Sequence, residues 1–148
     1  MPVCDPNLAF SDIIPITPPL PKPRSVGLTE VRTAARSLTE IRGYTDTLAP
    51  YLNSVKWTVG TQRLLPRRQV AEINTYLHEQ QIEMSSGGLL ETVMPLGAKA
   101  VRRYLEESKE LGFGIIEISS AMVAIAVEDK CRIVQRRSST SASSPNPR

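Results

Sequence analysis

The sequence predicts an α/β fold of about four parallel β–α units arranged as part of a barrel. Two observations lead to this prediction. Strand-like and helix-like patterns of apolar residues alternate four times along the 148 residues, and each strand-like stretch has one charged and one apolar face. Consecutive β–α units imply parallel strands joined by right-handed crossovers.

The first two units cover the first half of the folded region. Val26–Arg32 resembles a strand, and the residues behind it recur at helical spacing, at Leu38, Ile41, Thr45 and Leu48. Leu52–Thr58 predicts a second strand. The next helix begins at Pro66, which suits a first helical position, and its apolar face carries Val70, Ile73 and Leu77.

The third and fourth units follow the same pattern. Ile82–Ser86 predicts a strand, and a helix that ends near Gly112 carries Ala98, Val101, Leu105 and Ser108 on one face. Gly114–Ser120 predicts the fourth strand, and we expect Val127–Gln135 to be helical.

Both ends differ in composition from this region, so we divide the chain into a Pro-rich leader (1–24), a folded part (25–135) and a tail (136–148). The leader contains most of the 12 prolines, which favour extended backbone. It either covers the domain or serves as a ligand of SH3 type. The Ser-rich tail has too few apolar residues to offset its ordering entropy. We expect both ends to be disordered.

Charge and composition exclude several functional classes. The net charge is +3, but Lys and Arg balance Asp and Glu between Ser25 and Val134, so we expect no nucleic-acid surface. The longest apolar run is too short for a membrane helix, and no secretory signal opens the chain. Cys4 and Cys131 form neither a metal motif nor a disulfide framework. A cytoplasmic protein is the expectation.

The polarity of the strands points to candidate functional residues. One face is apolar, and the other carries Glu30 and Arg32, Lys56, Glu83 and Ser85, and Glu117 and Ser119. In a parallel barrel the polar face points into the lumen, where active sites lie at the carboxyl ends of strands. The alternative is that a half barrel leaves this face in water and the charges only solvate it.

Each candidate has a chemical role and a simpler structural explanation. Lys56 can neutralise a phosphate or an enolate oxygen, or it is a surface lysine. The turn Ser85–Gly88 can hold an anion on its backbone N–H groups, although glycines are common in such turns without a ligand. Glu30 and Glu117 can hold Mg²⁺, or they pair with Arg32 or Lys56.

Four strings in order resemble the phosphosulfolactate synthase family, which includes plant heat-stress-associated proteins. They are PRSVGLTEVR, SVKWTVGTQRLLPR, SSGGLLETV and VRRYLEESKELGFGIIEISS. The resemblance runs from Pro23 to Val134 and implies a truncated TIM-type barrel. It also implies a lyase-class reaction, Mg²⁺-dependent addition of sulfite to phosphoenolpyruvate, which forms a precursor of coenzyme M.

The resemblance assigns roles to residues of this chain. Those implied for catalysis are Lys56, Arg32 and Glu117, and Glu30 and Glu117 are implied for Mg²⁺. Those implied for substrate binding are Ser85, Ser86, Gly87, Gly88 and Ser119.

The chain also departs from the family pattern. The segments Thr33–Arg36, Thr58–Thr61 and Ala121–Val123 replace family-typical loops, and a full barrel needs about 250 residues. Three interpretations stay open: an enzyme of the sulfite-addition class completed by another half barrel, a non-catalytic divergent member that acts through protein contacts or in heat stress, and a truncated gene product. Because open sheet edges are a liability, we expect a homo-oligomer or a partner protein.

Overall fold

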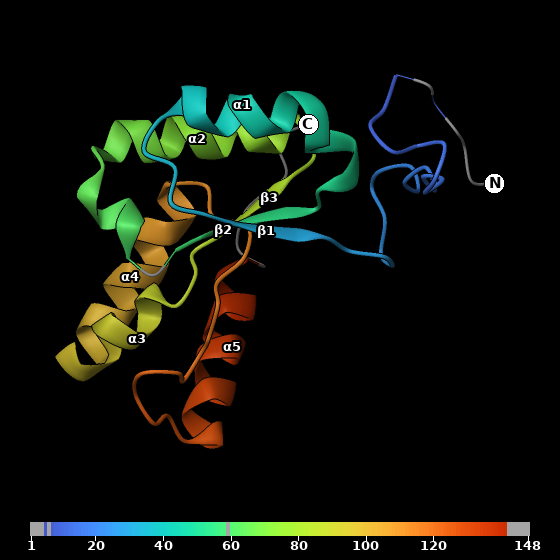
Figure 1. The fold of residues 1–148 in the computed structure, drawn as a ribbon. Coiled ribbons are helices and arrows are strands. Elements are labelled where there is room, and N and C mark those ends of the chain that lie inside the picture. The colour runs from blue at the N-terminus through green and yellow to red at the C-terminus, as the bar shows by residue number, and fades with distance from the viewer. Residues whose placement is uncertain (1–4, 6, 59, 142–148) are drawn as a thin grey trace, which may run out of the picture.

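A computed structural model describes residues 5, 7–58 and 60–141. Its centre is a parallel sheet of three strands, β1 (Glu30–Thr33), β2 (Ser54–Trp57) and β3 (Glu83–Ser85), in the order β1-β2-β3 (Figure 1). Strands and helices alternate as the sequence predicts as far as β3. The architecture is mixed α/β and is consistent with a partial TIM-type fold.

The predicted fourth strand is reduced to a single bridge. Ser85 pairs in parallel with Ile115, with Ile115 N donating to Met84 O at 3.1 Å and Ser86 N to Ile115 O at 3.0 Å. The prediction of a strand over Gly114–Ser120 was therefore wrong. The ladder stops because β3 ends in a turn, so that the N–H of Glu117 reaches the Ser86 hydroxyl, at 3.3 Å, instead of a strand carbonyl.

The first strand also begins later than predicted. The predicted range was Val26–Arg32, but β1 starts at Glu30. Val26 and Leu28 are 62% and 63% exposed, and Gly27 has a φ of +64°, a left-handed conformation outside the strand region. Val26 and Leu28 give the sequence a strand-like pattern, but β1 begins only after them.

The first two helices form where the apolar spacing predicts them. The helix α1 (Leu38–Leu48) is followed by the short 3-10 helix η1 (Ala49–Tyr51), and α2 (Arg67–Glu79) follows η2 (Thr61–Leu64). Ser37 caps α1 by accepting a hydrogen bond from Glu40 N at 3.2 Å. Pro66 directly precedes α2, which suits a residue without a backbone N–H.

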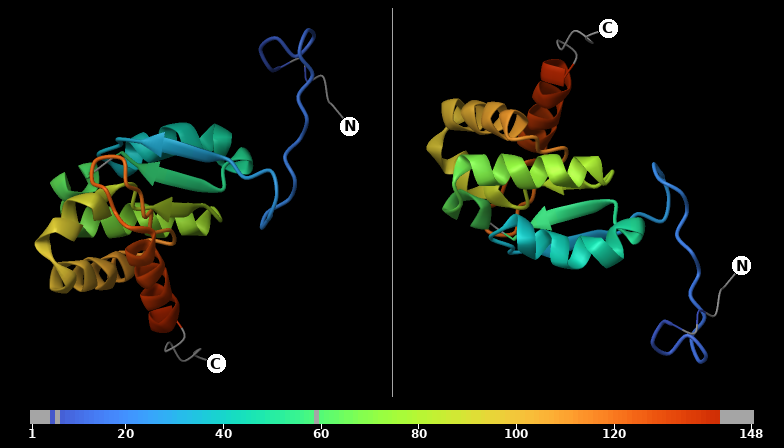
Figure 2. Two further views of the ribbon diagram at one scale, coloured as in Figure 1. Left: turned by 90° about the horizontal axis from the view of Figure 1, so that it is seen from below. Right: turned by 90° about the horizontal axis from the view of Figure 1, so that it is seen from above.

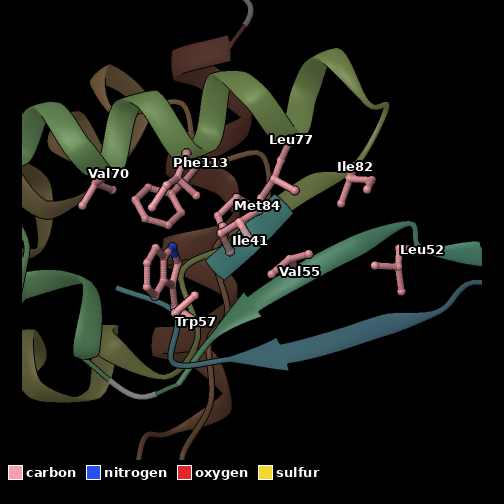
Figure 3. Packing of buried hydrophobic residues seen from close by; sticks show 11 residues of the cluster. Ile41, Leu52, Val55, Trp57, Val70, Leu77, Ile82, Met84 and Phe113 are labelled. Atoms are coloured by element: carbon pink, nitrogen blue, oxygen red, sulfur yellow. The ribbon is translucent and has the colours of Figure 1, made fainter. Parts of the chain in front are cut away.

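These two helices cover the apolar face of the sheet. Figure 3 shows the side chains of α1 and α2 meeting those of β2 and β3. The fully buried members of this core are Ile41, Val55, Trp57, Ile73, Leu77, Ile82 and Met84. The predicted division of the strands into an apolar and a polar face is therefore confirmed for β2 and β3, although Ser54 and Ser85 on the polar face are themselves buried.

A second, smaller core joins the helices that follow β3. Leu90, Val101 and Ile133 connect α3 (Leu89–Val93), α4 (Ala98–Glu110) and α5 (Val127–Ser141). The sequence predicted α4 but not α3, which is one short turn of helix followed by the 3-10 helix η3 (Met94–Leu96).

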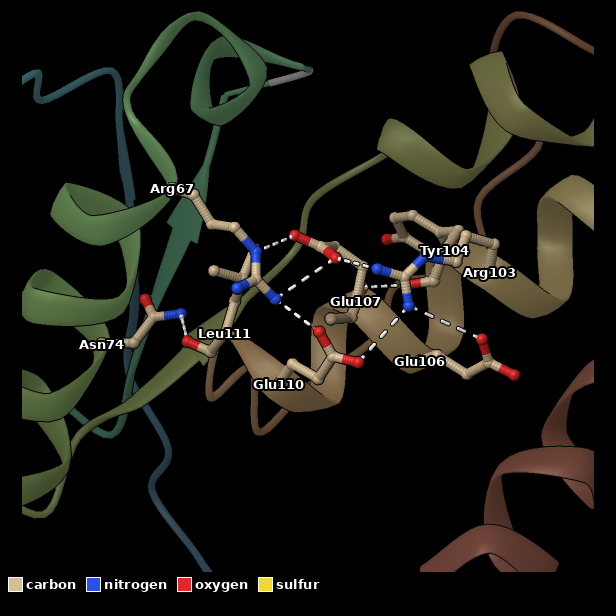
Figure 4. Close-up of polar contacts among 9 residues, drawn as sticks. Arg67, Asn74, Arg103, Tyr104, Glu106, Glu107, Glu110 and Leu111 are labelled. Atoms are coloured by element: carbon tan, nitrogen blue, oxygen red, sulfur yellow. Dashed lines mark hydrogen bonds and ion pairs between the residues drawn. The ribbon is translucent and has the colours of Figure 1, made fainter.

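Charged side chains fasten α4 to α2. The guanidinium of Arg67 on α2 contacts Glu107, with Nε to Oε1 at 2.6 Å, and also Glu110, and Arg103 contacts both glutamates from within α4 (Figure 4). Asn74 Nδ2 on α2 donates to Leu111 O at 2.7 Å. These contacts orient the third β–α unit against the second.

The start of the tail differs from the prediction of disorder, and for the leader disorder stays a prediction. The helix α5 continues through Ser141 and so includes the first residues of the predicted disordered tail. The leader has no named helix or strand over residues 7–24. Figure 2 shows it running away from the sheet. Residues 1–4 and 6 of the leader and 142–148 of the tail lie outside the described residues.

Within the described ranges, no helix is both long enough and apolar enough to cross a bilayer. Cys131 on α5 is exposed as a free thiol, and Cys4 lies outside the described residues.

Candidate functional site

The polar face of the sheet brings two cationic residues together at the carboxyl ends of neighbouring strands. Arg32 on β1 is the register partner of Lys56 on β2, and Lys56 is the partner of Ser85 on β3. Their side chains point to the same face, since register partners in a parallel sheet share a side. Neighbouring strands lie roughly 4.8 Å apart, so Arg32 and Lys56 extend from adjacent backbone positions on one face.

Glu117 completes this group from the segment beyond β3. Its carboxylate forms an ion pair with Lys56 Nζ, and the side chains are 26% and 27% exposed, so both still reach solvent. The structure thus brings together the three residues implied for catalysis. It also bears out the simpler possibility raised for Glu117, pairing with Lys56.

The turn Ser85–Gly88 is closed rather than open to an anion. All four residues are buried, and two of their backbone N–H groups are already used: Ser86 N donates to Ile115 O, and Gly87 N to the Ser85 hydroxyl at 3.4 Å. Gln62 Nε2 caps the turn by donating to Ser86 O at 2.7 Å. In this conformation the turn holds the chain together, so its substrate-binding role stays a prediction.

A glycine is required at the centre of this turn. Gly87 has a φ of +59°, and a Cβ added there would lie 2.2 Å from the carbonyl oxygen of Trp57. This close approach seats the turn directly on the end of β2, next to Lys56. The turn therefore positions the end of β2 that carries Lys56.

Glu91 on α3 is the functional-site residue that sequence reasoning missed. It is 1% exposed, and its carboxylate accepts hydrogen bonds from the Ser119 hydroxyl and from the backbone N–H groups of Ala121 (3.1 Å), Met122 (2.6 Å) and Val123 (3.0 Å). These donors lower the pKa of Glu91 to about 2, the Ser119 hydroxyl contributing most. Glu91 thus anchors the segment that follows Glu117.

The sequence carried only a weak signal for this role. Glu91 stands in the string SSGGLLETV, where a carboxylate occupies a helical turn between apolar residues. Its partners lie about 30 positions further along the chain, so no local pattern connects them. Ser119, implied for substrate binding, contacts Glu91 instead of standing open on the sheet face.

The two carboxylates implied for Mg²⁺ do not meet. Glu30 lies at the start of β1 and accepts a hydrogen bond from the Ser54 hydroxyl at 3.0 Å, whereas Glu117 lies beyond the carboxyl end of β3. The Glu117 carboxylate reaches Lys56 near the carboxyl end of β2, whereas Glu30 stays beside Ser54 at the amino end of the same strand. Among the described residues, no group of three or more His, Cys, Asp or Glu side chains is placed to hold a metal. Glu30 and Glu117 therefore do not fit a shared Mg²⁺ site.

A cavity of about 210 Å³ lies elsewhere, between η2, α2 and α4. Ser86 and Gln62 reach it, but Lys56, Arg32 and Glu117 do not line it. Its charged lining residues Arg67 and Glu107 belong to the ion-pair network that joins α2 and α4. The candidate site is therefore the open polar end of the sheet and not this cavity.

The fold is mixed α/β with a small parallel sheet, consistent with a partial TIM-type fold, and the site places cationic groups at the carboxyl ends of two of its strands. Residues 18–143 match the sequence profile of the (2R)-phospho-3-sulfolactate synthase (ComA) family, and the chain belongs to that family.

Two relatives show how far the similarity extends. The phosphosulfolactate synthase of Methanothermobacter thermautotrophicus is 32% identical over 121 residues, which is 81% of this chain and 46% of the relative. The protein Heat-Stress-Associated 32 of Arabidopsis thaliana is 26% identical over 117 residues, 77% of this chain and 41% of the relative. The chain spans less than half the length of these relatives.

Proposed function

We propose that this chain carries the first part of a phosphosulfolactate synthase-type site and binds phosphoenolpyruvate there. The observation that carries this proposal is the adjacency of Arg32 and Lys56 at the carboxyl end of the parallel sheet. Phosphoenolpyruvate carries a phosphate and a carboxylate, and two neighbouring cations suit such a ligand. Family membership supports sulfite as the second reactant.

The charges of Lys56, Arg32 and Glu117 suggest a role for each of them in the addition of sulfite to phosphoenolpyruvate. Sulfite forms a carbon–sulfur bond to the methylene carbon of phosphoenolpyruvate through its sulfur lone pair. The π electrons of the substrate then move toward its carboxylate, and the carbon that bears the phosphate takes up a proton. Lys56 and Arg32 stabilise the negative charge that develops, because fixed cations act strongly where water is partly excluded. Glu117 keeps Lys56 Nζ in place until the substrate arrives.

We also propose that the 148-residue chain by itself has no detectable synthase activity. Loss of one preorganised charge-stabilising donor commonly costs about 2.7–4 kcal/mol of transition-state stabilisation. In many barrels of this type, the phosphate-binding loops follow strands seven and eight, and the chain has no counterpart of these strands in its described part. No step of the proposed reaction runs through Mg²⁺, since Glu30 and Glu117 do not assemble a site for it.

The test separates binding from turnover. The purified chain is mixed with phosphoenolpyruvate, sulfite and Mg²⁺, and the formation of a sulfonate is followed by mass spectrometry. No product is expected. Binding of phosphoenolpyruvate is measured by calorimetry, and it should be lost in Lys56→Ala and kept in Lys99→Ala, which removes an exposed lysine on α4.

One result would contradict the binding proposal, and another would contradict the proposal that the chain alone is inactive. If Lys56→Ala and the unchanged chain bind phosphoenolpyruvate with equal affinity, Lys56 is not part of the binding site. Robust sulfonate formation that disappears in Lys56→Ala would confirm the site and overturn the statement that the chain alone is inactive.

A second candidate function, protein interaction, is favoured by the exposed edge of the sheet. In the described part of the chain, β1 pairs only with β2, so its other side presents unpaired backbone groups. A second copy or a partner protein is proposed to cover this edge, in the cytoplasm, where we expect the chain. Sedimentation that shows a stable folded monomer at micromolar concentration would contradict this candidate.

A further inference from the structure

Most of the described residues of the Pro-rich leader before Lys22 are exposed. Figures 1 and 2 show the segment before β1 leaving the sheet and running outward in each view. Leu20 within it is 54% exposed, and Pro18 and Pro21 on either side are exposed as well. An apolar side chain between prolines is thus presented to solvent.

The exposure of this segment repeats every three residues. Ile16, Pro19 and Lys22 are half-buried, whereas the residues between them are exposed: Thr17, Pro18, Leu20 and Pro21. A polyproline II helix has three residues per turn, so this period indicates one edge turned toward the protein and two edges turned outward. Pro18 and Pro21 share one outward edge, and Thr17 and Leu20 share the other.

The base of the segment is fixed to the body of the protein. The Arg24 guanidinium donates to Asn53 Oδ1 at 3.0 Å, to Tyr51 O at 2.6 Å and to Pro50 O at 3.1 Å. Lys22 Nζ donates to Gln80 O at 3.0 Å. Both basic side chains of the segment are therefore engaged by the protein itself, and Arg24 also donates to Leu20 O at 2.8 Å within the segment. The outward-facing residues Thr17, Pro18, Leu20 and Pro21 stay exposed.

We propose that Pro18-Pro19-Leu20-Pro21 docks into the aromatic-lined groove of a WW-type domain on a partner protein. Such grooves bind preformed polyproline II ligands at a low entropic cost, because proline fixes φ before binding. SH3-type grooves also bind proline ridges but pair an acidic pocket with a basic ligand residue. Lys22 and Arg24 are committed elsewhere, so a groove that reads only proline and leucine fits better.

In the experiment, a purified WW domain that selects Pro-Pro-Leu-Pro ligands is titrated into the full chain. The heat of binding is measured by calorimetry. Leu20→Ala and Pro21→Ala should each weaken binding by about tenfold or more, as loss of a central contact does. Pro95→Ala, which changes an exposed proline of η3, should leave the affinity unchanged. Unaltered emission from buried Trp57 shows that each variant is folded.

Two outcomes with the full chain would overturn the proposal. One is the absence of binding to the WW domain, or equal affinities for the unchanged chain and Leu20→Ala. The other is binding to an SH3 domain, titrated in parallel, in preference to the WW domain. A synthetic peptide of residues 14–25 provides a second measurement that does not depend on folding, and its failure to bind the WW domain would count equally against the proposal.

Discussion

Substitution of Gly87 by alanine tests whether the close contact between β2 and the following turn positions the site. Gly87 has a φ of +59°, and an added Cβ would lie 2.2 Å from Trp57 O. The carbonyl belongs to the backbone of a central strand and cannot rotate away as a side chain would. The turn or the end of β2 must therefore move by about 1 Å to restore an ordinary contact.

The expected loss of stability has two parts. A left-handed conformation costs an alanine about 1–2 kcal/mol, and the lower freedom of the unfolded alanine chain offsets about 0.4–1 kcal/mol. Forcing a methyl group into a packed site adds about 1–3 kcal/mol. Gly87→Ala should therefore lower the free energy of unfolding by about 1–5 kcal/mol, a large share of the 5–15 kcal/mol typical of a domain.

Gly27→Ala is the matched control. Its φ is +64°, but nothing lies within 4 Å of an added Cβ, so only the conformational cost applies. Urea unfolding is followed by the emission of Trp57, the single tryptophan and fully buried. The midpoint of Gly87→Ala should lie about 1 M below that of Gly27→Ala for a typical urea dependence. Equal midpoints would refute the reasoning from the Trp57 contact.

Two further predictions concern Glu91 and the cap of α1. The hydrogen-bond donors of Glu91 lower its pKa from 4.5 to about 2. The ionised carboxylate therefore stabilises the folded state fully above pH 4.5, and this stabilisation is lost as the pH falls toward 2. Glu91→Gln should therefore unfold more easily at pH 7, and the difference should shrink between pH 4.5 and 2 in urea titrations; a constant difference would contradict the assignment. Ser37→Ala should cost about 1 kcal/mol, because it removes the hydrogen bond to Glu40 N, and thermal unfolding without any loss would argue against the cap.

Local patterns were enough to locate most of the helices. The residues of α2 that face the core recur at helical spacing, and Pro66 and Ser37 stand at positions where their chemistry favours a helix start. These signals act within a few residues, so no knowledge of distant segments is needed. The same holds for the alternation in β2, where Val55 and Trp57 are buried and Lys56 between them stays partly exposed.

The candidate site could be predicted only in part. Alternation along the strands placed Lys56 and Arg32 on one face, and the register of β1 and β2 then brought them side by side. The sequence did not show that the carboxylates of Glu30 and Glu117 lie apart. Their relative positions depend on the register between strands, which the sequence alone does not give. It also did not show that the Ser85–Gly88 turn is filled by its own hydrogen bonds.

By itself, the sequence determined the alternation of strands and helices, the apolar face of β2 and β3 and the family to which the chain belongs. Only the tertiary structure decided that the fourth strand shrinks to one bridge at Ile115 and that Glu91 holds the segment after it. The physical reason is the range of the interactions. Periodicity and capping depend on neighbours in the chain, whereas a buried carboxylate and a strand partner depend on groups some 30 residues away that meet only when the chain has folded.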